Sequence, residues 1–88
     1  MNIQKSAFAG TMESSDVYVQ IEPSAGLEIQ VESVVYNQFG DAIREVVAEV
    51  LQEQGIETAA VRVIDRGALE CVIRARVETA IIRGKENG

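Results

Sequence analysis

The sequence has 88 residues, enough for a single domain spanning 1–88 and too few for two domains that enclose an active-site cleft. Its 47% hydrophobic and 25% charged residues are typical of a folded globular chain. Eight basic and fourteen acidic residues give a net charge of −6. This charge argues against nucleic acid and anionic membranes as partners, because lysine and arginine dominate binding to phosphates.

Histidine is absent and Cys71 is the single cysteine. The chain therefore lacks the usual general base, a partner for an internal disulfide and a thiolate cage for a metal. No apolar run reaches the roughly 20 residues that span a bilayer, and the amino terminus has no basic-then-apolar signal pattern. We expect a cytoplasmic protein that has no metal site and is not a stand-alone enzyme.

Three segments in the first third of the chain have the pattern of short strands. Residues 6–11 are small and mildly alternating, whereas Val17–Glu22 and residues 27–31 place an aliphatic side chain at every second position. Residues 23–26, Pro-Ser-Ala-Gly, are typical of a turn. We therefore expect the second and third strands to pair as a hairpin.

A long amphipathic helix follows. Ser33 is a candidate N-cap, although the helix start could lie nearer Asn37, and Gly55 stands where a left-handed C-cap belongs. Its apolar stripe consists of Tyr36, Phe39, Ile43, Val46, Val47, Val50 and Leu51.

A fourth strand over residues 60–64 and a second helix over residues 68–83 complete the chain. Arg76 falls within the apolar stripe of this helix, so we expect its side chain to pair with a carboxylate such as Asp65. The stripe itself contains Leu69, Val72, Ile73, Val77 and Ala80. The order strand, strand, strand, helix, strand, helix predicts an α+β fold, a two-layer sandwich of about four strands with both helices on one face.

The segment Glu13-Ser14-Ser15-Asp16 lies between the first two predicted strands. The simplest interpretation is a turn in which Asp16 or a serine bonds nearby backbone amides. The alternative is an exposed hydroxyl that another enzyme modifies, because no histidine is available to activate it. The carboxylates of Glu13 and Asp16 would then repel an attached phosphate and hold it away from the surface.

The remaining candidates for chemistry are weaker. Cys71 reads as an idle or packed thiol, and Arg74 as part of a solvated helix face. A glycosidase-like pair of Glu13 and Asp16 lacks the cleft or apolar surroundings that would raise one pKa. Residues 65–68, Asp-Arg-Gly-Ala, contain one glycine and do not form a phosphate-binding loop.

Several blocks of the sequence resemble the citrate lyase acyl carrier protein family, the gamma chain of that complex. They are AGTMESSD at residues 9–16, QFGDAIR at 38–44, DRGALEC at 65–71 and RARVE at 74–78. Together they cover almost the whole chain, and the position that matches the modified serine of the family is Ser14 rather than Ser15. Tyr36 departs from the family pattern, in which a charged residue is usual.

The resemblance implies a carrier without catalytic residues. Ser14 would hold phosphoribosyl-dephospho-coenzyme A through a phosphodiester bond, attached by a separate prosthetic-group transferase. The terminal thiol of that group would carry acetyl as a thioester. The alpha chain, an acyl transferase, would exchange acetyl for citrate, and the beta chain, a citryl lyase, would release oxaloacetate and regenerate the acetyl form.

Three alternatives stay open from the sequence. The chain could be the carrier subunit of malonate decarboxylase, which uses a similar group, or of citramalate lyase. It could also be an unmodified scaffolding subunit that binds partners through its sheet.

Overall fold

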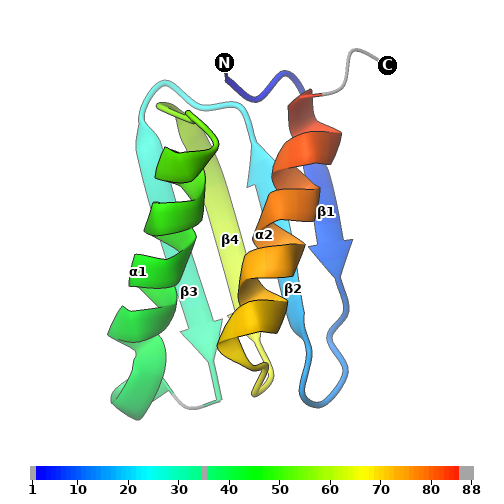
Figure 1. Ribbon diagram of the computed structural model, residues 1–88, viewed down its shortest axis with the longest axis vertical. Helices are drawn as coiled ribbons and strands as arrows, with labels where there is room; N and C mark the ends of the chain where they lie inside the picture. Colours follow the sequence, from blue (N-terminus) through cyan, green and yellow to red (C-terminus); the bar gives the residue numbers. More distant parts are fainter. Residues whose placement is uncertain (1, 35, 86–88) are drawn as a thin grey trace.

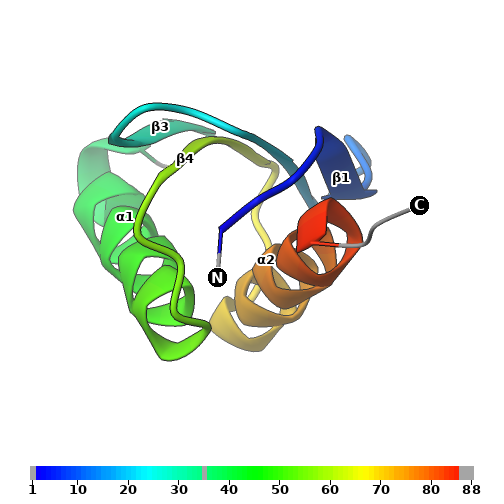
Figure 2. The same cartoon turned by 90° about the horizontal axis from the view of Figure 1, so that it is seen from above.

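Both helices lie side by side on one face of a four-stranded sheet, as Figure 1 shows, and Figure 2 shows the two layers from above. The computed structural model covers residues 2–34 and 36–85, excluding the side chains of residues 36–39. The predicted α+β sandwich and its order of elements are confirmed. The elements are β1 (Ala7–Gly10), β2 (Val17–Glu22), β3 (Leu27–Ser33), α1 (Tyr36–Glu53), β4 (Ala59–Asp65) and α2 (Glu70–Lys85).

The predicted hairpin of β2 and β3 is wrong. The strand order is β1-β2-β4-β3, so β4 lies between them and pairs antiparallel with β2 and parallel with β3. The parallel pair is connected by α1, which crosses over one face of the sheet and packs on β3. Period-two alternation identifies which face of a strand is buried, but it does not identify the strand that pairs with it. Here β4 pairs with β2 along one edge and with β3 along the other.

The core lies between the inner face of the sheet and the facing sides of the helices. Alternate residues of β2 and β4 are buried, and their outward neighbours are partly or fully exposed. Leu69, which the periodicity assigned to the second apolar stripe, is 71% exposed because α2 begins one residue later, at Glu70. Tyr36 and Phe39 of the first predicted stripe have side chains outside the described residues. The largest fully buried aliphatic side chains are Ile21, Leu51, Ile81, Val17, Val19, Val47, Val50, Val61, Val63 and Val77.

The predicted end of α1 is confirmed. Gly55 has a φ of 72°, its N–H bonds the carbonyl of Gln52 at 3.0 Å, and the N–H of Ile56 bonds the carbonyl of Leu51 at 2.9 Å. These two bonds satisfy carbonyls of the last helical turn that have no partner within the helix. The side chains of Leu51 and Ile56 are both buried at this end of the helix. No helix in the described part of the chain is both long and apolar enough to cross a membrane.

Ser33, which the sequence predicts as the N-cap of α1, has a hydrogen-bond partner in the sheet. It is the last residue of β3, which runs two residues further than predicted, and its Oγ donates a hydrogen bond of 2.8 Å to Oδ2 of Asp65. The hydroxyl therefore bonds a buried carboxylate at the end of β4.

Each edge strand of the sheet receives an arginine from the helix that covers it. Arg44 of α1 donates to the carbonyl of Ile29 in β3, and Arg83 of α2 donates to the carbonyl of Phe8 in β1 at 2.9 Å. Main-chain groups on an edge strand are a ready template for another chain, and a fixed positive charge at the edge opposes such pairing.

Candidate functional site

Figure 1 shows the connection from β1 to β2 at one end of the sheet, and Ser14 lies in a tight turn of this connection. The N–H of Asp16 bonds the carbonyl of Glu13 at 3.2 Å, and Ser15 has a φ of 65°, the conformation of the third residue of a type II turn. Ser14 is the second residue of that turn and is exposed. Its hydroxyl makes no hydrogen bond to any residue the structure describes, so its oxygen is open to an approaching enzyme.

The residues after Ser14 are anchored to the loop that follows β4. The N–H of Ser15 donates to the carbonyl of Arg66 at 2.8 Å, and the N–H of Arg66 donates to the carbonyl of Asp16 at 2.9 Å. Two residues of one strand thus face one residue of the other, which is a β-bulge whose first residue is left-handed. Glycine usually occupies that position because a side chain is disfavoured there. The turn is therefore a defined structure, and Ser14 is held at its tip.

Asp16 fastens the base of the turn to α2. Its carboxylate accepts hydrogen bonds from the Thr11 hydroxyl at 2.7 Å and from the Val17 N–H at 2.7 Å. Arg76 adds two more, from Nε at 3.2 Å and from Nη2 at 3.1 Å. Donors that favour the charged form, first Thr11, then Val17, and after them Arg76, lower the pKa of Asp16 from 3.8 to about 2, although partial burial opposes the change.

This network corrects the partner predicted for Arg76. The guanidinium pairs with Asp16, sixty residues away, and not with Asp65. It also changes the role expected of Asp16, whose side chain is only 15% exposed and has its charge matched by Arg76. Of the two carboxylates expected to repel a phosphate on Ser14, Glu13 alone is exposed.

Asp65 organises the other side of the site from within the core. It is 1% exposed, and its two carboxylate oxygens accept bonds from the Ser33 hydroxyl at 2.8 Å and from the Ala68 N–H at 2.9 Å. These bonds join the ends of β3 and β4 to the loop that leads into α2. That loop includes Arg66, so Asp65 supports the backbone against which the serine turn rests.

Gly10 allows β1 to enter the turn. Its φ is 91°, and a Cβ at this position would lie 1.8 Å from the carbonyl oxygen of Val17. Because the obstacle is backbone, a side chain would have to displace one of the two strands. Gly10 therefore belongs to the structure that presents Ser14, although it carries no chemistry.

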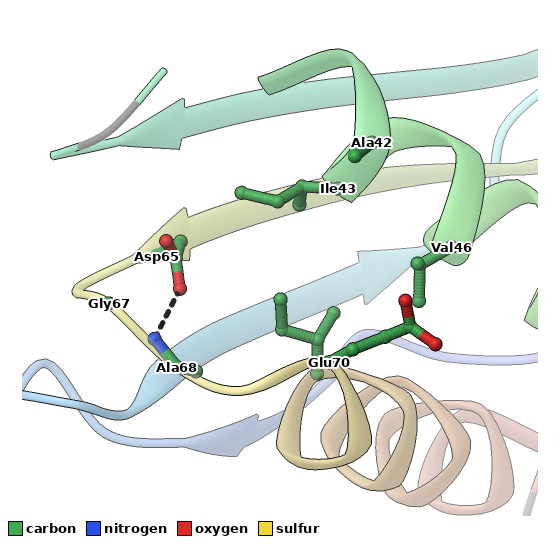
Figure 3. Close-up of a pocket in the computed structure, with 8 residues that line it drawn as sticks. Ala42, Ile43, Val46, Asp65, Gly67, Ala68 and Glu70 are labelled. Carbon is green, nitrogen blue, oxygen red and sulfur yellow. Dashed lines mark hydrogen bonds between the residues drawn. The ribbon is translucent and has the colours of Figure 1, made fainter. Parts of the chain in front are cut away.

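A separate cavity of about 340 Å³ opens between the two helices beside the end of β4 (Figure 3). Ser14 does not line it. The walls are aliphatic apart from the carboxylates of Asp65 and Glu70, and Figure 3 shows the bond from the Ala68 N–H to Asp65. The lining residues are Ala42, Ile43, Val46, Asp65, Gly67, Ala68, Glu70 and Ile73.

Cys71 and Arg74, the weaker candidates from the sequence, both lie on α2. Cys71 is exposed and free, at the start of α2. Arg74 is not simply solvated: its guanidinium lies 3.0 Å from Glu49, 3.3 Å from Glu70 and 3.7 Å from Glu53. Glu49 and then Glu70 raise the pKa of Arg74, and the contacts with Glu49 and Glu53 join α2 to α1. No group of three potential metal ligands occurs in the described part of the chain.

Two residues of the site had no role in the sequence analysis. Thr11 accepts the N–H of Glu13 at 3.1 Å and donates to Asp16, so it closes the turn from inside. A threonine two residues before a turn is a weak signal for such a motif. Arg66 belongs to one of the family blocks, but nothing in its spacing indicates that it faces the serine turn.

Comparison with known proteins places this geometry among carrier proteins. A profile of the ACP family, described as malonate decarboxylase delta subunit (MdcD), matches residues 4–84. The citrate lyase acyl carrier protein 2 of Salmonella paratyphi A is 52% identical over 98% of this chain and 91% of its own length. The citrate lyase acyl carrier protein of Escherichia fergusonii is 51% identical over the same shares of the two chains.

A solved structure agrees with the sequence comparisons. A chain in the crystal structure of a Pseudomonas malonate decarboxylase hetero-tetramer in complex with malonate superposes with a TM-score of 0.79 at 26% sequence identity. The match covers 91% of this chain and 84% of that one.

Proposed function

Because the chain belongs to the citrate lyase acyl carrier protein family, we propose that it is the acyl carrier subunit of a citrate lyase and carries its prosthetic group on Ser14. The observation that supports this proposal most directly is the exposed hydroxyl of Ser14 at the tip of an anchored turn, where it bonds none of the residues that the structure describes. A carrier needs an attachment point that a modifying enzyme can reach and from which a long arm can extend.

The residues around Ser14 fit a covalently attached, anionic arm. The turn is open to solvent, the adjacent carboxylate of Asp16 is compensated by Arg76, and Ser14 does not line the apolar cavity. In the attachment step the Ser14 oxygen loses its proton to a base of the transferase and bonds the phosphorus of an activated phosphate donor. The leaving group departs with the electron pair of the broken P–O bond.

The group we propose is phosphoribosyl-dephospho-coenzyme A, which supplies a thiol that holds acetyl or citryl as a thioester. This chain contributes position: the bulge fixes the turn, Gly10 allows the strands to approach, and Asp16 joins the turn to α2. Acyl exchange and cleavage belong to the alpha and beta chains. The lack of histidine agrees with this division, because a carrier needs no base of its own.

Citrate lyase is favoured over malonate decarboxylase by the degree of similarity. The citrate lyase relatives are 51–52% identical over nearly the whole chain, whereas the malonate decarboxylase chain is 26% identical. Citramalate lyase and an unmodified scaffold are distinguished from our proposal by experiment.

The test is intact-mass measurement on protein produced together with the citrate lyase genes and the transferase. We expect an added mass on the wild type, its complete loss in Ser14→Ala, and its retention in Ser15→Gly. Ser15→Gly is the matched control, because it removes the neighbouring hydroxyl and suits the left-handed position. Unmodified wild type, or an adduct that persists in Ser14→Ala, would show that the assignment is wrong.

The scaffold alternative makes a different prediction for the assembled complex. It requires full activity with Ser14→Ala, whereas a carrier requires that activity is lost with Ser14→Ala and kept with Ser15→Gly. Comparison of citrate, citramalate and malonate as substrates of the wild-type complex then identifies the reaction that the carrier serves.

A further inference from the structure

Arg66 lies directly against the turn that presents Ser14. Its backbone exchanges hydrogen bonds with the two residues that follow this serine, Ser15 at 2.8 Å and Asp16 at 2.9 Å. Asp65, whose bonds to Ser33 and Ala68 fix the neighbouring backbone, immediately precedes it. Arg66 is therefore held beside the turn by contacts on both sides.

The side chain of Arg66 bonds no other residue that the structure describes. It is exposed, and its guanidinium makes no ion pair or hydrogen bond to any residue that the structure describes. The other arginines all bond carboxylates or carbonyls: Arg44 bonds Ile29, Arg62 pairs with Glu32, Arg74 pairs with Glu49, Glu53 and Glu70, Arg76 pairs with Asp16, and Arg83 bonds Phe8. Among the described residues, Arg66 is thus the arginine whose guanidinium has no protein partner, so all its donors can bond a ligand.

Neither carboxylate of the turn neutralises the charge of the Arg66 guanidinium among the described residues. Arg76 compensates Asp16, and Glu13, the exposed carboxylate of the turn, makes no ion pair within the described residues. A guanidinium offers planar paired donors that suit phosphate oxygens, and charge-assisted bonds of this kind are stronger than neutral ones.

We propose that Arg66 binds the phosphate that joins the prosthetic group to Ser14 and thereby orients the base of the arm. This inference rests on the proposed function, since it requires a phosphodiester at Ser14. Arg66 acts as a positioning residue: it counters the repulsion from Glu13 and directs the first phosphate toward the loop between β4 and α2. The thiol at the far end stays free to reach the partner chains.

The test uses holo-protein loaded by the transferase, with the variants Arg66→Gln and Lys5→Gln. Lys5 is the matched control because it is exposed, carries the same charge and precedes β1, at the opposite end of that strand from Ser14. We measure the ³¹P resonance of the phosphodiester and the Nε–H resonances of the arginines in the apo and holo states.

We expect the Arg66 Nε–H resonance to shift on loading while that of Arg62 does not. The ³¹P resonance should change in Arg66→Gln, stay unchanged in Lys5→Gln, and be partly restored in Arg66→Lys, which keeps the charge without the planar donors. The rate of loading should fall severalfold in Arg66→Gln and depend less on salt.

Two results overturn the inference in distinguishable ways. In the first, all proteins load, the Arg66 Nε–H resonance does not shift on loading, and the ³¹P resonance of Arg66→Gln equals that of Lys5→Gln. Arg66 then does not bind the phosphate, although Ser14 remains the attachment site. If the wild type itself carries no adduct, the proposed function fails and the role of Arg66 fails with it.

Discussion

Replacement of Gly10 by alanine tests whether the close approach of β1 and β2 holds the serine turn in place. The added Cβ would lie 1.8 Å from the Val17 carbonyl oxygen, and the backbone at Gly10 has a φ of 91° that a side chain disfavours. The left-handed conformation alone costs about 1–2 kcal/mol in a residue with a Cβ. Moving the strand apart also weakens the pairing of Gly10 with Tyr18, at about 1 kcal/mol for each hydrogen bond lost.

We therefore expect Gly10→Ala to lower the free energy of unfolding by about 3 kcal/mol, out of roughly 4–13 kcal/mol for a chain of this length. The midpoint of thermal unfolding should fall by about 12–24 °C. Urea titration and thermal melts of the apo-protein measure both quantities, and Gly26→Ala is the control, since nothing lies within 4 Å of a Cβ there. A loss below about 1 kcal/mol in Gly10→Ala, or equal losses in both variants, would refute the reasoning.

Two further predictions concern the network and the core. The pKa of Asp16 is about 2 in the folded protein and near 3.8 without its partners, so the free energy of unfolding of the wild type should decline as the pH falls from about 4 to about 2. Asp16→Asn should lack this part of the decline. Urea titrations at several pH values measure it, and parallel curves of stability against pH for the two proteins would contradict the prediction. Leu51→Ala should cost about 2–5 kcal/mol because Leu51 is 1% exposed, whereas Leu69→Ala should stay within about 0.5 kcal/mol. Equal changes in the urea midpoint would show that the burial argument is wrong.

The local structure of this protein follows from periodicity, and its topology does not. The alternation in β2 and the helical stripe before Gly55 identify these elements because burial on one face imposes a repeat on the sequence. The neighbour of β3 depends on the path of α1 over the sheet. No repeat within residues 27–31 distinguishes a hairpin partner from the parallel partner that β3 finds in β4.

The site shows the same division. Ser14 could be selected because a turn motif and the family blocks coincide there. The pairing of Arg76 with Asp16 could not, because sixty residues separate the two in the sequence and only the fold brings Asp16 next to α2. Thr11 belongs to the site through its hydroxyl, which bonds Glu13 and Asp16, and Arg66 through its backbone, which bonds Ser15 and Asp16. Neither contact could be read from the spacing of residue types.

The two arginines that bond the outer strands from the helices affect how this chain behaves at high concentration. Because Arg44 bonds β3 from α1 and Arg83 bonds β1 from α2, a second copy that lengthened the sheet would meet a cation at either edge. Substitution of either residue should therefore first appear as turbidity on concentration or storage, while the circular dichroism of the dilute protein stays intact.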